Sequence, residues 1–312
     1  MDISIIIVNW NTKNLLISCI DSIYNNISNL HFEIIVVDNG SQDGSITAVK
    51  EKYPNIILIA NNKNLGFAVA NNMAFKLMKG KYALLLNTDC ILTKGAIEEL
   101  FNFMEKHPEA GICCGQLLNM DGSKQNSFSS FPSIFFYLIN ESLLKFIWPS
   151  KFPSKYKSYS FPIKVDSCIG ACMLIRKKAL KDVGYFDEDY FFFFEETDMA
   201  YRMKKKGWEI YFIPSAYIYH AQGKSVGAKP YSRMMFYKSR YIFFKKHYPN
   251  IYRFFYVLIF LRVIINTIIN FMGIFLTIGL NKSIKNKFLT YLNLIIWHIK
   301  GCPQVYPKGN KE

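Results

Sequence analysis

The chain has 312 residues, of which 51% are hydrophobic, so it can bury a core for one domain with an appendage or for two domains. Its net charge of +15 is uneven: residues 1–220 carry 23 Lys and Arg against 22 Asp and Glu, and residues 221–312 carry 15 against one. Because apolar runs separate the late charges, they suit an anionic membrane surface, and we expect no nucleic acid partner.

The cysteines indicate a reducing compartment. There are seven of them, an odd number, and no two are spaced as CxxC. The first residues form a strand-like apolar run and lack the basic and then apolar pattern of a secretion signal. We therefore expect free thiols in the cytosol.

Predicted strands and helices alternate over the first 107 residues. Apolar runs rich in β-branched residues predict strands, and apolar residues at helical spacing predict helices. The strands lie within residues 3–11, 32–45, 55–62 and 82–90, and the helices within residues 12–26, 45–53, 66–78 and 95–107. This alternation predicts an α/β fold, a mostly parallel sheet with helices on both faces, which binds ligands beyond the carboxyl ends of its strands. Asn9, Asp38 and Asp89 stand at such ends, and we expect them on one rim.

The next part of the chain is less regular. Residues 116–165 lose periodicity and predict a variable loop region with one short helix over residues 134–148. Regular patterns then return. They predict a strand and a helix start over residues 165–180, a helix over residues 195–207 and a strand over residues 209–220.

Each polar residue near these strand ends has a chemical and a structural interpretation. Asp89 suits a divalent cation held together with ligand phosphates, or it caps the next helix. Asp38 suits a bond to a ribose or base, or an Asx turn. The helix start that contains Asn64 and Gly66 suits backbone amides close to a phosphate or sugar, or an ordinary cap.

Later positions also have two interpretations. Small residues around Gly170 leave room for a sugar or allow tight packing. His220 ends the last predicted strand, where a lone His is more often a surface or core residue than a ligand. Cys168 and Cys172 lack a second Cys/His pair at zinc spacing, so we expect no zinc site there.

Three acids directly follow a run of aromatic residues. Glu195 and Asp198 share a helix face, and Glu196 points about 100° away from Glu195. Acids at the start of a helix and bases at its end satisfy the helix dipole, which explains some of these charges structurally. The aromatic run over residues 191–194 would raise the pKa of a neighbouring carboxylate and suit it to accept a proton.

Taken in order, these segments resemble the inverting family 2 glycosyltransferases of GT-A fold, and within them the bacterial rhamnosyltransferase-like branch. The matching segments are VNWN (8–11), VVDNGSQDGS (36–45), NLGFAVANN (64–72), LLLNTD (84–89), GACMLIRKKAL (170–180), GYFDEDYFFFFEETDMAYRMKKKGW (184–208) and IYH (218–220). The resemblance implies a catalytic domain over residues 1–225, with a nucleotide-sugar-binding half (1–115), a variable region (116–165) and an acceptor or catalytic half (166–225). A basic, membrane-associated helical region would follow over residues 226–312.

The resemblance also implies a donor site. Asp38 would contact the base or ribose of the nucleotide, and Asn9, Asn64 and Gly66 would line the donor pocket. Asp89 would hold Mg²⁺ or Mn²⁺ with His220 as a second ligand, and Asn87 stands where the family usually carries its first acid. The missing carboxylate implies weaker or more phosphate-dependent metal binding.

On the acceptor side, the resemblance implies that Glu196 is the catalytic base, although the family usually has Asp there. Gly170, Glu195 and Asp198 would line the acceptor or sugar pocket. Glu196 would take a proton from an acceptor hydroxyl as that oxygen attacks the anomeric carbon, and the cation would stabilise the leaving diphosphate. One such step inverts the anomeric centre.

The basic tail contains an apolar stretch of membrane-spanning length. Residues 254–261 and 263–280 carry no charge, and only Arg262 separates them. Asn266, Asn270 and Gly273 interrupt the stretch, so we predict an interfacial or re-entrant helical pair followed by an amphipathic segment over residues 288–299. A single span is the alternative. Either arrangement would place the protein on the cytoplasmic face of the bacterial inner membrane.

The sequence thus predicts an inverting transferase that moves L-rhamnose from dTDP-rhamnose to a polyprenyl-diphosphate-linked saccharide in surface polysaccharide assembly. A UDP-hexose enzyme would share nearly all of these residues. Asn87 and Glu196 also fit an inactive membrane-bound scaffold derived from the fold. A nucleotidyltransferase shares the alternating pattern and the metal acid, but this chain lacks its Gly-rich, basic opening loop.

Overall fold

The computed structural model describes residues 1–134, 157–221 and 229–306. The chain divides into two compact units. The first unit holds Met1–Phe131 and most of the described residues from 157 to 221, and the second holds Phe192–Phe194 and the last three helices. The short helix predicted over residues 134–148 lies, except for its first residue, outside the described residues.

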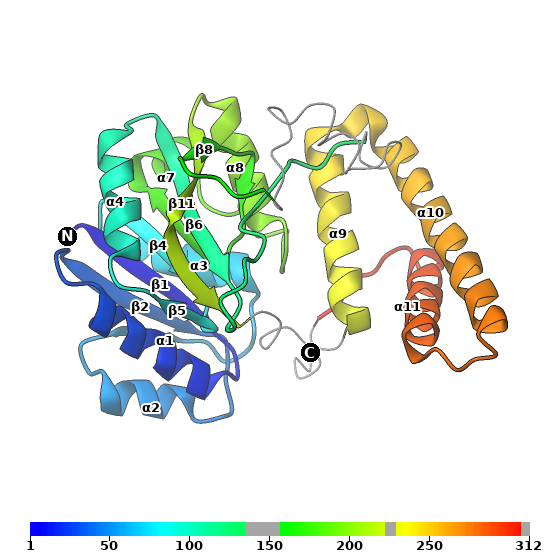
Figure 1. The fold of residues 1–312 in the computed structure, drawn as a ribbon, viewed down its shortest axis with the longest axis horizontal. Helices are drawn as coiled ribbons and strands as arrows, with labels where there is room; N and C mark the ends of the chain where they lie inside the picture. The colour runs from blue at the N-terminus through cyan, green and yellow to red at the C-terminus, as the bar shows by residue number, and fades with distance from the viewer. Residues whose placement is uncertain (135–156, 222–228, 307–312) are drawn as a thin grey trace. The chain divides into compact units, whose positions relative to one another are not determined.

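A nine-stranded sheet forms the centre of the first unit (Figure 1). Its strands are β1 (Ile3–Asn9), β2 (Phe32–Asp38), β3 (Ile57–Ala60), β4 (Tyr82–Leu86), β5 (Cys90–Leu92), β6 (Ala110–Leu118), β8 (Ile163–Lys164), β10 (Cys172–Arg176) and β11 (Glu209–His220). The order is β3-β2-β1-β4-β10-β6-β11-β5, with β8 also beside β11. Separately, β7 (Phe128–Ser129) pairs with β9 (Ser167–Cys168).

The predicted α/β fold is confirmed, and its sheet is parallel in one half and mixed in the other. Neighbouring strands are parallel from β3 through β2 and β1 to β4. Beyond them β10 runs antiparallel to both β4 and β6. The long strand β11 is parallel to β6 and antiparallel to β5 and β8.

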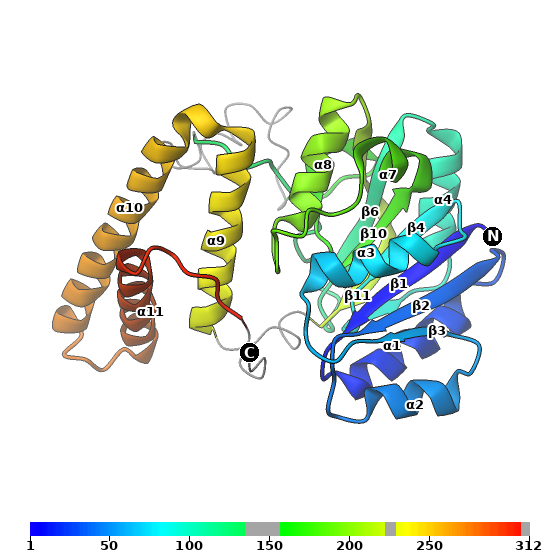
Figure 2. The same cartoon turned by 180° about the vertical axis from the view of Figure 1, so that it is seen from behind.

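Helices cover both faces of this sheet because its strands are apolar on both sides. Ile3, Ile5 and Ile7 of β1 belong to one core cluster, and Ile6 belongs to the other. The first cluster is covered by α1 (Lys13–Asn26), α2 (Ser45–Lys52) and α4 (Ala96–Lys106). The second is covered by α3 (Phe67–Leu77), α7 (Lys177–Val183) and α8 (Glu195–Lys205), which Figure 2 shows on the opposite face.

The strand predicted over residues 82–90 is divided. The strand β4 ends at Leu86, and the backbone N–H of Asn87 donates to the carbonyl oxygen of Ala171 at 2.8 Å. The chain then turns, and Cys90 begins β5, where it lies opposite His220 of β11. Asp89 therefore lies in the turn between two strands, close to the end of β11.

The second unit has an aromatic core between α9 (Lys229–His247), α10 (Pro249–Leu276) and α11 (Lys282–Ile299). The rings of Phe244 on α9 and Phe255 on α10 stack with centroids 3.5 Å apart. Tyr241 donates to or accepts from Nε2 of His298 on α11 at 2.7 Å. These contacts hold the three helices together.

The predicted interruption of the apolar stretch is wrong, because α10 is one continuous helix of 28 residues. The side chain of Asn270 donates to the carbonyl oxygen of Asn266 at 2.7 Å, so it bonds within the helix and does not break it. A Cβ atom at Gly273 would lie 3.2 Å from Ile284 of α11, so this glycine allows close helix contact. By length and mean hydropathy (2.1) α10 can cross a membrane.

Candidate active site

The carboxyl ends of β1 and β2 share a network of buried polar side chains. Asn9 lies opposite Asp38 in the strand register and donates from Nδ2 to its Oδ2 at 2.7 Å. The other carboxylate oxygen of Asp38 accepts from the backbone N–H of Ser41 at 2.7 Å. Asp38 thus orders the loop after β2, as the structural interpretation expects, and its contact with a nucleotide stays a prediction.

This network continues to the turn that carries Asp89. The hydroxyl of Thr12 donates to Oδ1 of Asn9 at 2.7 Å and lies 3.0 Å from the hydroxyl of Thr88. The three predicted strand-end residues therefore stand on one rim. We did not single out Thr12 or Thr88 from the sequence, although each lies next to or within a quoted motif.

The start of α3 contacts the segment that precedes the three acids. Oδ1 of Asn64 accepts from the backbone N–H of Gly66 at 2.9 Å. Gly66 has a φ of +90°, and a Cβ atom there would lie 2.6 Å from the carbonyl oxygen of Phe191. That same oxygen accepts from the backbone N–H of Phe67 at 2.9 Å. A glycine is therefore required for the backbone to pass here.

Asp89 and His220 come together at the ends of β4 and β11. Nε2 of His220 lies 3.4 Å from Oδ1 of Asp89, and both side chains are buried. Neither oxygen of Asp89 accepts a hydrogen bond from any residue that the structure describes. Buried carboxylate oxygens are normally satisfied, so this pair has free acceptor capacity for a cation.

Cys90 lies in the same cluster but does not suit the same cation. Its Sγ donates to the carbonyl oxygen of Ala171 at 3.3 Å, and burial raises the pKa of the thiol well above its usual value. A protonated thiol is a poor ligand. The remaining donors, a carboxylate and an imidazole, fit Mn²⁺ or Mg²⁺ completed by phosphate oxygens and water.

Glu195 and Glu196 begin α8 and lie in surroundings that favour their protonated forms. Burial raises the pKa of Glu196 to about 7. Burial and the neighbouring charge of Glu196 raise the pKa of Glu195 well above its usual value. Oε2 of each residue accepts no hydrogen bond within the described chain. The pKa is raised in the expected direction, with burial as its main cause, and Glu196 suits a proton acceptor near neutral pH.

Two consecutive residues connect this acid to the Asp89 turn. A Cβ atom at Gly170 would lie 3.8 Å from Cγ of Glu196, so the glycine leaves space beside this side chain. The carbonyl oxygen of the next residue, Ala171, accepts from the backbone N–H of Asn87 at 2.8 Å. Glu196 thus lies beside the same short segment to which the turn with Asp89 is bonded. The partly exposed side chain of Asn87 lies on this turn.

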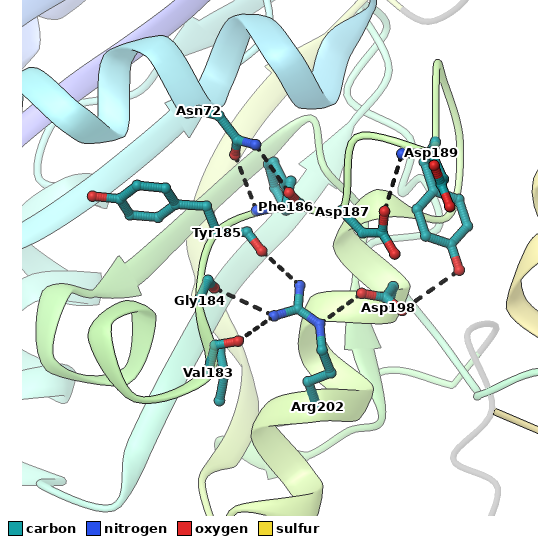
Figure 3. Close-up of polar contacts among 10 residues, drawn as sticks. Asn72, Val183, Gly184, Tyr185, Phe186, Asp187, Asp189, Asp198 and Arg202 are labelled. Carbon is teal, nitrogen blue, oxygen red and sulfur yellow. Dashed lines mark hydrogen bonds and ion pairs between the residues drawn. The ribbon is translucent and has the colours of Figure 1, made fainter. Parts of the chain in front are cut away.

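Asp198 has structural contacts, and its place in the sugar pocket stays a prediction. It is fully buried and accepts from Nε of Arg202, four residues later, at 2.7 Å. Arg202 also donates to the carbonyl oxygens of Val183 and Tyr185 at 2.6 and 2.8 Å (Figure 3). The pair therefore holds the loop after α7.

Asn72 of α3 holds the same loop from its other side. Its side chain accepts from the backbone N–H of Phe186 at 3.0 Å and donates to the carbonyl oxygen of Phe186 at 2.9 Å (Figure 3). It also donates to Oε1 of Glu188 at 2.9 Å. The loop between α7 and α8 is thus fixed to α8 by Arg202 and to α3 by Asn72. These bonds fix the position of the chain ahead of the acids that begin α8.

This fold and this site define the class of nucleotide-sugar transferases, and comparison with known proteins gives the family. Residues 4–184 match the family model described as glycosyl transferase family 2. The chain belongs to glycosyltransferase family 2. It is 30% identical over 226 residues to N-acetylglucosaminyl-diphospho-decaprenol L-rhamnosyltransferase of Mycobacterium tuberculosis, covering 67% of this chain and 73% of that protein. It is 26% identical over 206 residues to rhamnosyltransferase WbbL of Escherichia coli, covering 62% and 75%.

Solved structures show the same GT-A fold. The chain matches GalNAc-T7, solved with UDP, GalNAc and Mn²⁺, with a TM-score of 0.54 and 15% identity over 70% of this chain and 44% of that one. It matches the first 349 residues of S. aureus TarS with a TM-score of 0.52 and 18% identity over 78% of this chain and 64% of that one. The chain thus spans less than two thirds of either solved protein, and the likeness concerns the fold.

Proposed function

We propose that the chain is an inverting transferase that moves L-rhamnose from dTDP-rhamnose to a polyprenyl-diphosphate-linked saccharide during surface polysaccharide assembly. The observation that carries this proposal is the short Gly170–Ala171 segment, where Gly170 lies beside Glu196 and Ala171 bonds to the turn bearing Asp89. The names of the mycobacterial and E. coli relatives support rhamnose as the sugar, and the first of them supports a lipid diphosphate as the carrier.

The chain's own residues supply the chemistry as follows. The rim network of Asn9, Asp38 and Asn64 would bind and orient the nucleotide at the strand ends. Glu196 would accept the proton of the acceptor hydroxyl while that oxygen attacks the anomeric carbon from the face opposite the diphosphate. Glu195 would line the acceptor pocket beside it.

Asp89 and His220 would hold the divalent cation. The two unsatisfied oxygens of Asp89 and Nε2 of His220 offer donors that Mg²⁺ and Mn²⁺ accept. When bound, such a cation offsets the negative charge that develops on the leaving diphosphate. With Asn87 in place of an acid, we expect the cation to bind much more tightly when a nucleoside diphosphate is present.

A donor panel tests this function. The full chain is incubated with dTDP-rhamnose, UDP-glucose, UDP-GlcNAc or UDP-galactose and a short-chain polyprenyl-diphosphate saccharide, and products are identified by mass spectrometry. We expect a product mass increased by one deoxyhexose, formed with Mn²⁺ and lost in EDTA. Transfer of a hexose from a UDP-sugar would show that the donor is a UDP-hexose and not dTDP-rhamnose. One relative is named as a hexosyltransferase, which favours this second candidate. A chain that neither transfers nor hydrolyses any donor would be a scaffold.

We also propose that the second unit binds the cytoplasmic face of the inner membrane. Its helix α10 exposes many large apolar side chains, among them Leu261, Ile265 and Ile269. The surrounding segment is basic, with 15 Lys and Arg against one acid over residues 221–312, and therefore suits anionic lipid headgroups. On that face, an enzyme meets both cytosolic sugar nucleotides and a lipid-linked acceptor.

A further inference from the structure

Gln125 contacts both the backbone carbonyl group and the side-chain ring of His220, the candidate metal ligand. It lies in the segment between β6 and β7, 95 positions before its partner. Its Nε2 donates to the backbone carbonyl oxygen of His220 at 2.6 Å and to Oδ1 of Asn119 at 2.7 Å. Its Oε1 lies 2.9 Å from Nδ1 of the His220 ring.

These contacts determine which ring nitrogen of His220 carries a proton. A backbone carbonyl oxygen only accepts hydrogen bonds, so the amide nitrogen of Gln125 must face it. The amide oxygen of Gln125 must then face Nδ1 of His220. Because an amide oxygen also only accepts, Nδ1 must donate, and the neutral ring has its lone pair at Nε2.

That lone pair lies beside Asp89. Nε2 of His220 is 3.4 Å from Oδ1 of Asp89, and both oxygens of this buried carboxylate lack hydrogen bonds within the described chain. Two acceptors that face each other repel, whereas a cation between them attracts both.

We propose that Gln125 is a positioning residue that holds His220 in the Nδ1–H tautomer and thereby presents Nε2 to the cation held by Asp89. This proposal rests on the cation of the proposed function and extends it to a residue outside the ligand set. Histidines that bind metals generally donate their other ring N–H to a fixed acceptor, and removing that acceptor weakens the metal about 10- to 100-fold.

The test compares Gln125→Met with Lys124→Met. Both changes introduce the same side chain into the same segment, but Lys124 contacts Ser158 and not His220. The full chain is labelled with ¹⁵N at its five histidines, and the His220→Asn variant identifies the His220 signals. Ring ¹⁵N shifts in the metal-free protein report the tautomer, and Mn²⁺ titration by electron paramagnetic resonance in saturating dTDP reports the affinity.

We expect wild type and Lys124→Met to show a protonated Nδ1 and an unprotonated Nε2. In Gln125→Met we expect the Nε2–H form to appear and the Mn²⁺ affinity to fall about 10- to 100-fold. An unprotonated Nδ1 or an imidazolium in wild type would overturn the proposal, and so would Gln125→Met with unchanged ring shifts and affinity.

These readouts separate the proposal from the proposed function. If sugar transfer persists in EDTA and no Mn²⁺ binds, the role of Gln125 is refuted while the transferase stands. If Mn²⁺ affinity and tautomer depend on Gln125 but no donor is used, the role of Gln125 stands while the transferase fails.

Discussion

Burial raises the pKa of Glu196, and a raised pKa near neutrality also suits its proposed role as the general base. Burial raises its pKa to about 7, so it is largely protonated in acid solution and largely a carboxylate above neutrality. A general base must be deprotonated before it can accept a proton. We therefore expect the turnover rate to rise with pH through about 7 and then to level off, measured with saturating donor and acceptor. A rate that is flat from pH 5.5 to 8.5 would contradict this assignment.

Replacing Glu196 by Gln removes the base and keeps the shape of the side chain. We expect turnover to fall about 10²- to 10⁴-fold, the usual contribution of a general base, with the dissociation constant for dTDP unchanged. Transfer is followed by mass spectrometry and dTDP binding by calorimetry. Glu196→Asp, which restores the residue typical of the resembled family, should keep measurable activity. A fully active Gln variant would remove Glu196 from the mechanism.

The same carboxyl makes stability depend on pH in a defined direction. The pKa of Glu196 in the folded chain, about 7, lies above its ordinary value of 4.5, so the folded state binds more protons between these pH values. The contribution of Glu196 to stability is therefore full below pH 4.5 and is lost as the pH rises through 7. We expect Glu196→Gln to melt several degrees above wild type at pH 8, and the difference to shrink toward pH 5 in scanning calorimetry.

Gly66 shows how one missing side chain brings two parts of the site together. A Cβ atom there would lie 2.6 Å from the carbonyl oxygen of Phe191, and the residue has a φ of +90°. Gly66→Ala should therefore lower Tm and weaken dTDP binding, because the start of α3 must move. Gly95→Ala is the matched control, since Gly95 also has a positive φ but nothing within 4 Å. Equal losses in both variants would show that only backbone strain matters.

At the scale of elements, the loop between α7 and α8 depends on the Asp198–Arg202 ion pair. Removing one partner of a buried pair costs about 3 kcal/mol, which corresponds to roughly 6–12 °C in Tm for a domain of this size. We expect such a loss for Asp198→Asn and for Arg202→Met, and a smaller loss for the double variant than for the sum of the two. Scanning calorimetry measures all three.

A second readout decides between this structural role and the sugar contact that we predicted for Asp198. If Asp198 only holds the loop, Asp198→Asn should lower Tm while the KM for the acceptor changes little at a temperature well below the melt. An unchanged Tm together with a strongly raised acceptor KM would restore Asp198 to the sugar pocket.

The elements predicted from sequence and those observed differ where a partner is distant along the chain. The strands and helices of residues 3–60 follow local periodicity and were predictable. The division of the strand at Leu86 depends on Ala171, and the contact of Gln125 depends on His220, so no local pattern indicates either. The Asp198–Arg202 pair was predictable, because an acid and a base four positions apart on a helix commonly form an ion pair. From the sequence, we interpreted these charges only through the helix dipole.

The contacts between site residues were also hard to predict where the two residues are far apart in the sequence. Asp89 and His220 were predicted together from family resemblance alone, since their separation of 131 positions hides the contact between β5 and β11 that joins them. The interruption predicted at Asn266 and Asn270 is wrong because the side chain of Asn270 bonds to the backbone of its own helix, which residue type alone does not predict.

At the scale of the whole chain, three residues of the aromatic run, Phe192–Phe194, and the acids that follow them belong to different units. Phe192–Phe194 pack with α9: the hydroxyl of Ser239 donates to the carbonyl oxygen of Phe192 at 2.8 Å, and the rings of Phe193 and Phe194 lie against Phe236. Both phenylalanines have a positive φ, of 70° and 73°, which is uncommon for this residue type. Deleting the last helices would therefore expose this run, so truncation is a poor test of membrane binding.

Charges on the exposed face of α10 test membrane binding with the second unit intact. Ile265, Ile269 and Met272 are 55%, 58% and 59% exposed and share one helix face. An acid at the centre of a membrane helix costs roughly 2.5 kcal/mol or more, so three Glu residues should move the chain from vesicles of anionic lipid to the soluble fraction in flotation. Three Ser residues at these positions separate the effect of charge from the loss of apolar surface.

The matched control places Glu at exposed apolar positions of the first unit, Tyr24, Leu77 and Met120, which are 48%, 48% and 61% exposed. That variant should still float with the vesicles. The α10 variant should keep transfer to a short, water-soluble acceptor but lose it with a long-chain lipid acceptor in vesicles, because only the latter requires binding to the bilayer. If the α10 variant floats like wild type, another surface binds the membrane. If it loses transfer to both acceptors, the second unit contributes to catalysis as well as to location.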